Sequence, residues 1–577
     1  MATLPPWAQE MRDLFRSGSV SQFIIHGNIF DVVPADTAAG RKLLPLKEFF
    51  DEVMFSTYDV VLQYDRGSGI RATRGAKDWG AWLTQFAGDD DPLNLATVRE
   101  AGKALELIDR YLLRTLNLQA ITDGKTTCPK KIAIVIDFAE FIVPHGDPIQ
   151  LGGEIGANVV KLLGWANDPA ILQSNIVTVL MTEGLHNLND LVVENPHASK
   201  LAIPLPDEPE MLDFLKTLAQ TQFPELESQC EVTIEVLARR LAGLSRVGAL
   251  TAISLALKNN RTITQSYLSS MKKDMIEREC QDLLEFLESP YTLDNVAGLD
   301  AVKAWLREDT QLLRRGILYA LPMGYLIAGR IGTGKTFIVQ CWAGELGIPC
   351  AVFKNFRDKW VGATESNLEK IFAILRAIGQ VVVFVDEADQ AAGKRDSSSD
   401  DGGLSGRVYA MLAKEMSDTR NRGRILWVFA TSRPDLLEVD IKRQGRLDVH
   451  IPLFPPQTPA EMRALMLVTA RKVKFPLKEE DLPEFPEGLV LGGNEVEGAL
   501  IRALRTYELQ PDPKRPLKAI LADTLKEVRP NANTRKLEYM DLVAVKECTD
   551  ARFLPPQYRD MSPEQLEQRL DELRRFM

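Results

Sequence analysis

The chain has 577 residues, and its 69 Lys and Arg against 80 Asp and Glu leave a net charge of −11. This length exceeds what one hydrophobic core serves, so roughly two to four domains are expected, and the net acidity disfavours broad binding to nucleic acid or to a membrane surface. The six cysteines include no C-x-x-C pair, and no apolar run approaches the roughly 18 residues of a membrane span. These features predict a protein of the cytoplasm or an equivalent reducing compartment, without a signal peptide.

The first half of the chain alternates apolar strands with helices. The predicted strands are "QFIIHG", "DVVLQYD", "KIAIVID", "NIVTVLMTE" and "LAIPLP", and the helices between them are "LKEFFDEVMF", 97–118 and 155–166. A helix opening "DEPEMLDFLKTLA" then starts a helical stretch to about residue 288.

The same order returns from residue 324. Strands "GYLIAG", "PCAVFKN", "VVVFVD", "ILWVFATS" and "VHIPLF" alternate with a Gly-rich loop and its helix and with helices near 366–378 and 405–417. The segment "PPQTPAEMRALMLVTA" parallels the earlier "PDEPEMLDFLKTLA". Such alternation predicts an α/β fold with a parallel sheet flanked by helices.

The repeat predicts two tandem α/β modules, each followed by a helical lid; two unrelated α/β domains are the alternative. The expected domains are a degenerate α/β module at 1–205, its lid at 206–288, an active module at 289–455, its lid at 456–556 and a C-terminal amphipathic helix at 557–577.

A phosphate-binding loop is predicted in the second module. Residues 329–336 read "GRIGTGKT", which matches G-x-x-x-x-G-K-[ST] between a predicted strand and a predicted helix. Gly329, Gly332 and Gly334 let backbone N–H groups turn toward phosphate oxygens. Lys335 can reach the β- and γ-phosphates of ATP, and the Thr336 hydroxyl can ligate Mg²⁺.

Two acids end the strand "VVVFVD". Asp386 can hold Mg²⁺, and Glu387 can orient and polarise the attacking water. The first module repeats this strand as "VIDFAE", with Asp137 followed by Phe138, and it has no G-K-[ST] after "FIIHG". Because Phe138 cannot activate water and the phosphate loop is missing, we expect the first module to keep the fold without nucleotide hydrolysis, and without nucleotide binding.

Residues 292–450 resemble the AAA clade of the AAA+ ATPases, which includes FtsH-type and valosin-containing-protein-type motors. The segment "TLDNVAGLDAVKAWL" resembles the family's opening segment, and "FATSRPDLLEVDIKRQGRLD" resembles its second region of homology. An inert first module beside an active second one is also similar to AAA proteins of cyanobacterial and plastid genomes.

The resemblance implies further site residues. Val296 and Ala297 take the positions that cup adenine, and Ser432 takes that of a water-positioning asparagine. Arg443 and Arg446 match an arginine-finger pair that acts in trans; two ordinary surface arginines are the alternative. The implied nucleotide-binding set is Val296, Ala297, Gly329, Arg330, Ile331, Gly332, Thr333, Gly334, Lys335, Thr336, Phe337 and Asp386.

Some positions depart from the family pattern. Arg330 and Ile331 stand where the family usually has proline, and Ser432 reaches less far than asparagine toward the attacking water, which favours slower turnover. A trans-acting finger would require a closed ring of copies, and the family implies six.

The segment "DKWVGATESN" resembles the family's central-pore loop, with Lys359, Trp360, Val361 and Gly362 as its core. Trp360 is interpreted as a grip on a substrate chain, with a buried core aromatic as the alternative. The polar stretch 393–406 stands where the family has its second pore loop.

The C-terminal "MSPEQLEQRLDELRRFM" predicts a helix. Ser562 caps it, Pro563 fits its first position and Gln565 completes a capping box. The apolar stripe is Leu566, Leu570, Leu573 and Phe576. We expect it to pack on its own lid, and docking of a partner is the alternative.

Three functions remain open at this stage. The leading hypothesis is a ring-forming ATPase that uses ATP and Mg²⁺ to remodel or thread an unknown protein substrate. The second is an ATP-gated assembly factor or scaffold with slow turnover. The third, a nucleic-acid motor, is disfavoured by the net acidity and by the Trp-Val-Gly loop.

Overall fold

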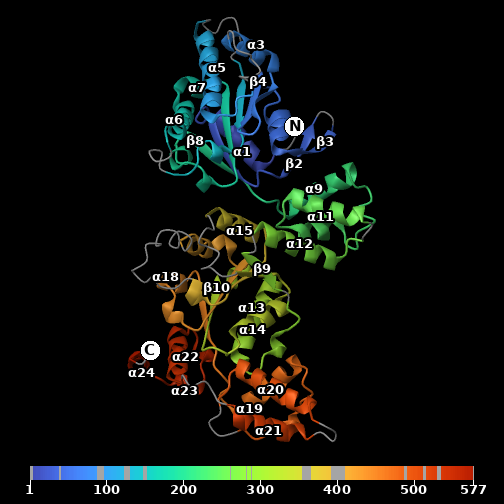
Figure 1. Cartoon of the computed structure of the whole chain (residues 1–577), viewed down its shortest axis with the longest axis vertical. Coiled ribbons are helices and arrows are strands. Elements are labelled where there is room, and N and C mark those ends of the chain that lie inside the picture. Colours follow the sequence, from blue (N-terminus) through green and yellow to red (C-terminus); the bar gives the residue numbers. More distant parts are fainter. Residues whose placement is uncertain are drawn as a thin grey trace. The chain divides into compact units, whose positions relative to one another are not determined.

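The computed structural model describes residues 4–37, 40–87, 97–121, 130–146, 152–259, 262–280, 283–287, 289–353, 365–391, 410–485, 490–510, 515–528 and 534–575. The chain divides into two compact units, residues 1–275 with 365–377 and residues 276–364 with 378–577. Each unit contains a six-stranded sheet with helices packed against it (Figure 1). Among the described residues, no helix combines the length and apolar character needed to cross a bilayer.

The sheet of the first unit has the strand order β5-β4-β6-β7-β1-β8. All neighbours pair in parallel except β4 and β5, which are antiparallel. The strands of this unit are β1 Gln22–Gly27, β2 Val32–Thr37, β3 Gly40–Pro45, β4 Val60–Asp65, β5 Gly69–Arg74, β6 Ile132–Ile136, β7 Ile176–Thr182 and β8 Ala198–Ile203.

Helices cover both faces of this sheet, because its buried strands are apolar on both sides. Ile24 and Ile134 share a core with α3, α5 and α6, whereas Phe23 and Val135 share another with α1 and α2. The helices are α1 Pro6–Arg16, α2 Leu46–Phe49 with a π-helical continuation Phe50–Met54, α3 Ala76–Ala87, α5 Ala101–Ile121, α6 Gly153–Asn167, α7 Pro169–Leu172 and α8 Asp190–Val193.

The sequence reading missed two parts of this unit. Where a loop was expected after β1, strands β2 and β3 form an antiparallel hairpin. After β4 the chain turns back as β5 before the helix α3. Both hairpins contain polar and Gly residues, which weaken the apolar alternation on which strand prediction depends.

Four helices follow as the first lid: α9 Glu208–Thr221, α10 Ile234–Leu241, α11 Arg246–Lys258 and α12 Gln265–Glu279. A capping box between Asp207 and Glu210 starts α9. The expectation of helix to about residue 288 is wrong at its end, because Leu284–Leu287 form strand β9.

The sheet of the second unit has the order β14-β10-β13-β12-β11-β9. Strand β9 pairs antiparallel with β11, and the other neighbours are parallel. The strands are β9 Leu284–Leu287, β10 Gly324–Ala328, β11 Cys350–Phe353, β12 Val381–Val385, β13 Ile425–Thr431 and β14 Val449–Pro452.

One face of the second sheet packs on α13 and α14, with Tyr325, Ile327 and Phe384 in the shared core. Its helices include α13 Asp300–Arg314, α14 Lys335–Leu346, α16 Ala388–Ala391 and α18 Val439–Lys442, with short turns at Leu293–Asn295 (η4) and Pro434–Leu436 (η7). Helix α15 (Glu365–Ile378) precedes β12 in the chain, and its residues 365–377 group with the first unit.

The second lid consists of α19 Pro459–Lys472, α20 Gly493–Glu508 and α21 Leu517–Glu527, which share one apolar core. The chain then returns to the sheet, where α22 (Thr534–Glu547) packs against β14 and η7.

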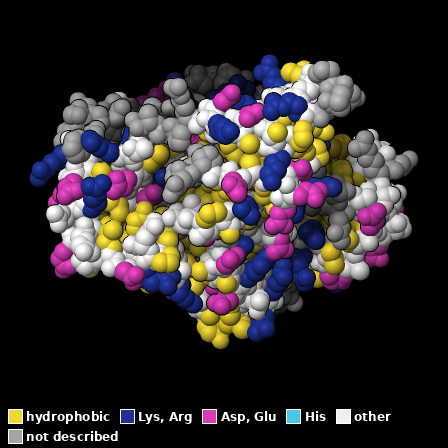
Figure 2. Space-filling view, turned by 90° about the horizontal axis from the view of Figure 1, so that it is seen from below, with side chains coloured by type: hydrophobic (Ala, Val, Ile, Leu, Met, Phe, Trp, Pro, Cys, Tyr) yellow, Lys and Arg dark blue, Asp and Glu magenta, His cyan; other side chains and the backbone are white. Residues whose placement is uncertain are grey.

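On the face that Figure 2 displays, Lys and Arg side chains lie among Asp and Glu side chains.

The C-terminal helix forms as predicted. After the short helix α23 (Pro556–Arg559), α24 (Pro563–Arg574) begins with the capping box of Ser562 and Gln565. Leu566, Leu570 and Leu573 pack against α22, within the predicted lid region, whereas Phe576 lies outside the described residues.

The two sheets have the same strand order when read from β8 and from β14. Each sheet ends in an antiparallel edge strand. Strand β5 follows its neighbour β4 in the chain, whereas β9 precedes all the other strands of the second sheet. The chain therefore folds as two tandem α/β modules, as the sequence predicts.

Candidate nucleotide site

The phosphate loop connects β10 to α14, at the carboxyl end of the sheet. Gly332 and Gly334 have φ of 86° and 84°, a region that residues with a Cβ rarely adopt. A Cβ at Gly329 would lie 2.3 Å from the carbonyl oxygen of Leu453. The glycines are therefore required by the path of the backbone itself.

Lys335 folds back over this loop. Its Nζ donates to the carbonyl oxygens of Gly329 (2.8 Å) and Arg330 (3.1 Å). Burial lowers the pKa of Lys335, and the nearby carboxylates of Asp386 and Asp389 oppose that shift. A bound phosphate would give this ammonium group a stronger partner than two carbonyl groups.

Thr336 and Asp386 come together as predicted. The Thr336 hydroxyl donates to Oδ2 of Asp386 at 2.7 Å, and the backbone N–H of Glu387 donates to Oδ1 at 2.9 Å. A hydroxyl and a carboxylate oxygen form the kind of hard donor set that Mg²⁺ takes beside phosphates. No group of three or more His, Cys, Asp or Glu arranged to hold a metal occurs among the described residues.

Glu387 has a left-handed backbone, with φ of 48°. This conformation is unfavourable for a residue with a long side chain and persists where the surrounding structure holds it. Here the N–H bond to Asp386 helps to fix the turn.

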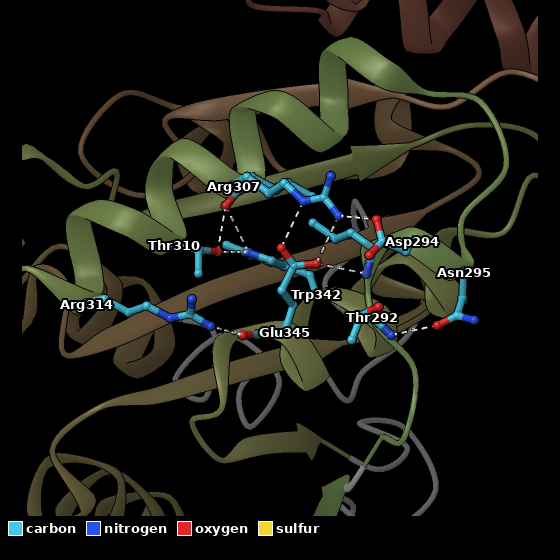
Figure 3. Close-up of polar contacts among 10 residues, drawn as sticks. Thr292, Asp294, Asn295, Arg307, Thr310, Arg314, Trp342 and Glu345 are labelled. Carbon is cyan, nitrogen blue, oxygen red and sulfur yellow. Dashed lines mark hydrogen bonds and ion pairs between the residues drawn. The ribbon is translucent and has the colours of Figure 1, made fainter.

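The segment before α13, which carries Val296 and Ala297, is held by a polar network (Figure 3). Arg307 donates to Glu345 (2.9 Å) and Asp294 (2.6 Å), and Glu345 also accepts from the backbone N–H of Leu293 (3.0 Å). The two carboxylates raise the pKa of Arg307. This network fixes the turn that precedes Val296, whose carbonyl accepts from Lys303 at 3.3 Å.

Phe337 lies between two other elements of this unit. Its ring centroid is 5.6 Å from that of Tyr291, and the Lys472 ammonium of lid helix α19 lies 5.8 Å from the Phe337 ring. The first turn of α14 therefore contacts both the opening segment and the lid.

Ser432 follows the end of β13. Before it, the Thr431 hydroxyl donates to Asp389 at 2.5 Å and accepts from the backbone N–H of Arg433 at 2.9 Å. The turn that carries Ser432 is thereby tied to the segment after Glu387.

The two predicted finger residues differ in exposure. The Arg443 side chain is 59% exposed and pairs with Asp440 at 3.3 Å. The Arg446 side chain is 9% exposed, donating to Ser417 Oγ (2.6 Å) and to Asp440 O (2.8 Å) and Oδ2 (2.5 Å). In this conformation only Arg443 is available to a neighbouring molecule.

The lid touches the phosphate loop directly. The N–H of Gly493, at the start of α20, donates to the carbonyl oxygen of Gly332 at 2.7 Å. A Cβ on Gly492 would lie 2.9 Å from the same oxygen.

The predicted pore-loop residues Lys359, Trp360, Val361 and Gly362 and the stretch 393–406 lie outside the described residues.

The turn after β6 in the first module has the same backbone conformation as the turn after β12, with a different side chain. Phe138 has φ of 53°, and its N–H donates to Oδ1 of Asp137 at 3.0 Å, as Glu387 does to Asp386. Lys47, near the start of α2, forms an ion pair with the buried Asp137, and its ammonium lies 5.8 Å from the Phe138 ring. A lysine cation thus binds the carboxylate whose counterpart in the second module is bonded by Thr336.

An internal carboxylate also joins the first module's loop to its lid. Asp31, whose side chain is 2% exposed, accepts from the backbone N–H groups of Arg246 (3.0 Å) and Val247 (2.9 Å), at the start of α11. The Arg246 guanidinium lies 3.5 Å from Asp31 and 3.3 Å from Glu210. A helix N-terminus with an arginine is a common anion site, and here the chain fills it itself.

Sequence reasoning missed Lys47, Asp31, Arg246 and the Arg307–Glu345 network. Each pairs with a residue far away in the chain, so no spacing pattern marks it. Lys47 alone offered a signal. It lies near the start of the first helix after β1, as Thr336 lies near the start of the helix after β10.

Three families match consecutive parts of the chain. Residues 1–204 match the family described as "AAA+ chaperone, N-terminal Rossmann-like domain", and residues 211–281 match "AAA+ chaperone, second helical domain". Residues 325–454 match "ATPase family associated with various cellular activities (AAA)".

Individual relatives also match parts of the chain. An ATP-dependent zinc metalloprotease FtsH 2 of Symbiobacterium thermophilum is 35% identical over 29% of this chain and 30% of that protein. A peroxisomal ATPase PEX6 of Candida glabrata is 30% identical over 43% of this chain and 27% of that protein, and the human PEX6 is 28% identical over 50% and 32%. The chain spans about a third of the length of these curated relatives. With the three family matches in order along two modules of the same topology, the chain belongs to the AAA+ ATPases.

Proposed function

We propose that the second module binds ATP with Mg²⁺ and hydrolyses it. The observation that carries this proposal is the contact of 2.7 Å between Thr336 and Asp386, with Glu387 beside them and Lys335 over the loop. This arrangement supplies a cation for the phosphates, two oxygen ligands for the metal and one carboxylate for the attacking water.

Each residue then has one task. Lys335 would leave its two carbonyl partners for the phosphates, Thr336 and Asp386 would hold the metal, and Glu387 would accept a proton from the attacking water. Ser432 positions that water from the adjacent strand end. When bound, Mg²⁺ would supply positive charge to neutralise the phosphate oxygens.

The first module is proposed to be a structural tier. Asp137, the carboxylate that would hold a metal, is paired with Lys47, and Arg246, the cation that would bind a phosphate, is paired with Asp31. Neither group is therefore free for a nucleotide. The expected domain boundaries stay proposals, except that β9 belongs to the second sheet.

The wider function is proposed from the family. A ring of copies, six by the resemblance, would place Arg443 of one copy at the ATP of the next, and hydrolysis would remodel or thread a protein substrate. The pore-loop residues, a reducing cytoplasmic location and the similarity to cyanobacterial and plastid proteins remain predictions.

The second candidate, an ATP-gated scaffold with slow turnover, is favoured by one observation. Ser432 has a shorter side chain than the asparagine of the family pattern, so its hold on water would be weaker. Binding of ATP without appreciable turnover by the wild-type protein would favour this candidate.

A trap variant tests the proposal. Glu387→Gln should bind ATP with near-normal affinity, lose turnover and retain a protein client long enough for its identification by mass spectrometry. Glu479→Gln, an exposed lid residue, is the matched control and should release clients as the wild-type protein does. Near-normal hydrolysis by Glu387→Gln would remove Glu387 from the mechanism.

A further inference from the structure

A buried carboxylate of the C-terminal region faces the phosphate loop. Asp541 lies on α22, the helix after the lid, and its side chain is 8% exposed. Its Oδ2 lies 3.6 Å from Nη1 of Arg330, which is the second residue of the loop and 15% exposed.

This carboxylate is incompletely satisfied. Its Oδ1 is buried and has no hydrogen-bond partner among the described residues. Burial raises the pKa of Asp541 to about 7 and Glu538 adds to the shift, while Arg330 and Lys335 oppose it. Tyr558, on α23, is a further titratable group that interacts with both Asp541 and Arg330.

The phosphate loop is therefore held at two points by residues that follow the second sheet in the chain. Gly493 donates its N–H to Gly332, and Asp541 pairs with the side chain of Arg330. The carbonyl of Arg330 also accepts from Lys335. Since a loop with three glycines has many accessible conformations, contacts that fix its remaining residues select among them.

We propose that Asp541 is a positioning residue for the phosphate loop, which it holds through Arg330 in the conformation that receives ATP. This inference rests on the proposed function, because it concerns the affinity of the same site. Arg330, which departs from the family pattern, thereby gains a specific role. No atom of Asp541 needs to touch the nucleotide.

The proposal carries a pH dependence of known sign. Protonation of Asp541 removes the ionic partner of Arg330, so ATP affinity should fall as the pH decreases from about 8 to 6. Folding responds in the opposite direction, because a raised carboxyl pKa means that the folded protein binds the proton more tightly than the unfolded chain. The ionised Asp541 therefore aids binding while it costs stability.

The test uses the full chain and magnesium with fluorescent ATP. Asp541→Asn should raise the dissociation constant at pH 8 about fivefold or more, and its affinity should vary less between pH 6 and 8 than that of the wild type. Arg330→Ala should have a similar effect, and the double variant should be no weaker than either single variant. Asp560→Asn is the control. Asp560 is an exposed aspartate in the same C-terminal region, and this variant should bind ATP as the wild type does.

A second measurement separates positioning from loss of structure. The melting temperature of nucleotide-free Asp541→Asn at pH 8 should equal or exceed that of the wild type, because the variant removes a buried charge. Unchanged affinity and pH profile in Asp541→Asn, or reduced affinity together with a lowered melting temperature, would overturn the proposal. A wild-type protein that binds no ATP would instead overturn the proposed function.

Discussion

The ends of β6 and β12 have one backbone and two sets of partners. Phe138 and Glu387 share a left-handed conformation and the same N–H contact to the preceding aspartate. Around them, the first module has Lys47 on Asp137 and Arg246 on Asp31, whereas the second has Thr336 on Asp386 and Lys335 on carbonyl oxygens of the phosphate loop.

If the first module binds no nucleotide, as proposed, this difference explains how the fold is kept without the site. A buried carboxylate such as Asp137 is costly unless a cation pairs with it, and N–H groups at a helix start need an acceptor. In the first module, side chains of the chain itself meet both needs. The turn at Phe138 has the same left-handed backbone and N–H contact as the turn at Glu387, so this turn does not require a glutamate.

The finger residue is expected to give the largest contrast. Arg443→Ala should lower ATP turnover by roughly 10³-fold or more, whereas Glu194→Ala, at the corresponding spacing after β7, should leave turnover unchanged. Mixing Arg443→Ala with Lys335→Ala should restore part of the activity, since one variant supplies the finger and the other the site. Absence of any recovery in mixtures that form oligomers would contradict action in trans.

Exchange of the residue after the strand-end aspartate comes next. Glu387→Gln should reduce turnover by roughly 10²–10⁴-fold, measured as phosphate release at saturating ATP. Phe138→Glu should confer no second active site, because Lys47 still binds Asp137. A gain of turnover in Phe138→Glu, Lys335→Ala would show that the first pocket can be revived by one residue.

The internal anion of the first module should matter for stability alone. Asp31→Ala leaves Arg246 and the start of α11 without this partner, and should lower the free energy of unfolding by about 3 kcal/mol. In urea unfolding, the affected transition should be the one that ATP does not shift. A lowered ATP affinity in Asp31→Ala would contradict the separation of roles.

The smallest expected contrast is a pH effect confined to the second sheet. The Tyr325 hydroxyl donates to the buried Asp309 at 2.7 Å, and burial raises the pKa of Asp309 to about 6. Because the folded state holds that proton more tightly, wild-type stability should fall relative to Asp309→Asn by roughly 2 kcal/mol as the pH rises from 4 to 7.

The first sheet provides the control for this effect, since Phe23 stands on β1 where Tyr325 stands on β10 and has no acidic partner. Parallel pH profiles of the wild type and Asp309→Asn, measured by chemical unfolding, would contradict the assignment.

The sequence predicted what depends on local pattern. The loop at 329–336, the acids at 386–387 and the alternation of buried strands with helices are each visible within a few residues. Strand β9 was not predicted, because its four residues gain stability from pairing with β11 and not from their own periodicity.

The side-chain pairs were not predictable for a related reason. Asp541 and Arg330 are far apart in the chain, as are Asp31 and Arg246, and each pair comes together only in the folded module. The burial of Arg446 likewise depends on Ser417 and Asp440, and its sequence position alone gave it the same role as Arg443.

The central claim is that one module of two holds nucleotide. Equilibrium dialysis of the full chain with magnesium and labelled ATP, up to millimolar ligand, measures the number of sites directly. We expect one ATP per chain for the wild type and none for Lys335→Ala, with Lys47→Ala as the matched first-module variant still binding one. A second equivalent of ATP in the wild type, or one equivalent remaining in Lys335→Ala, would contradict the account.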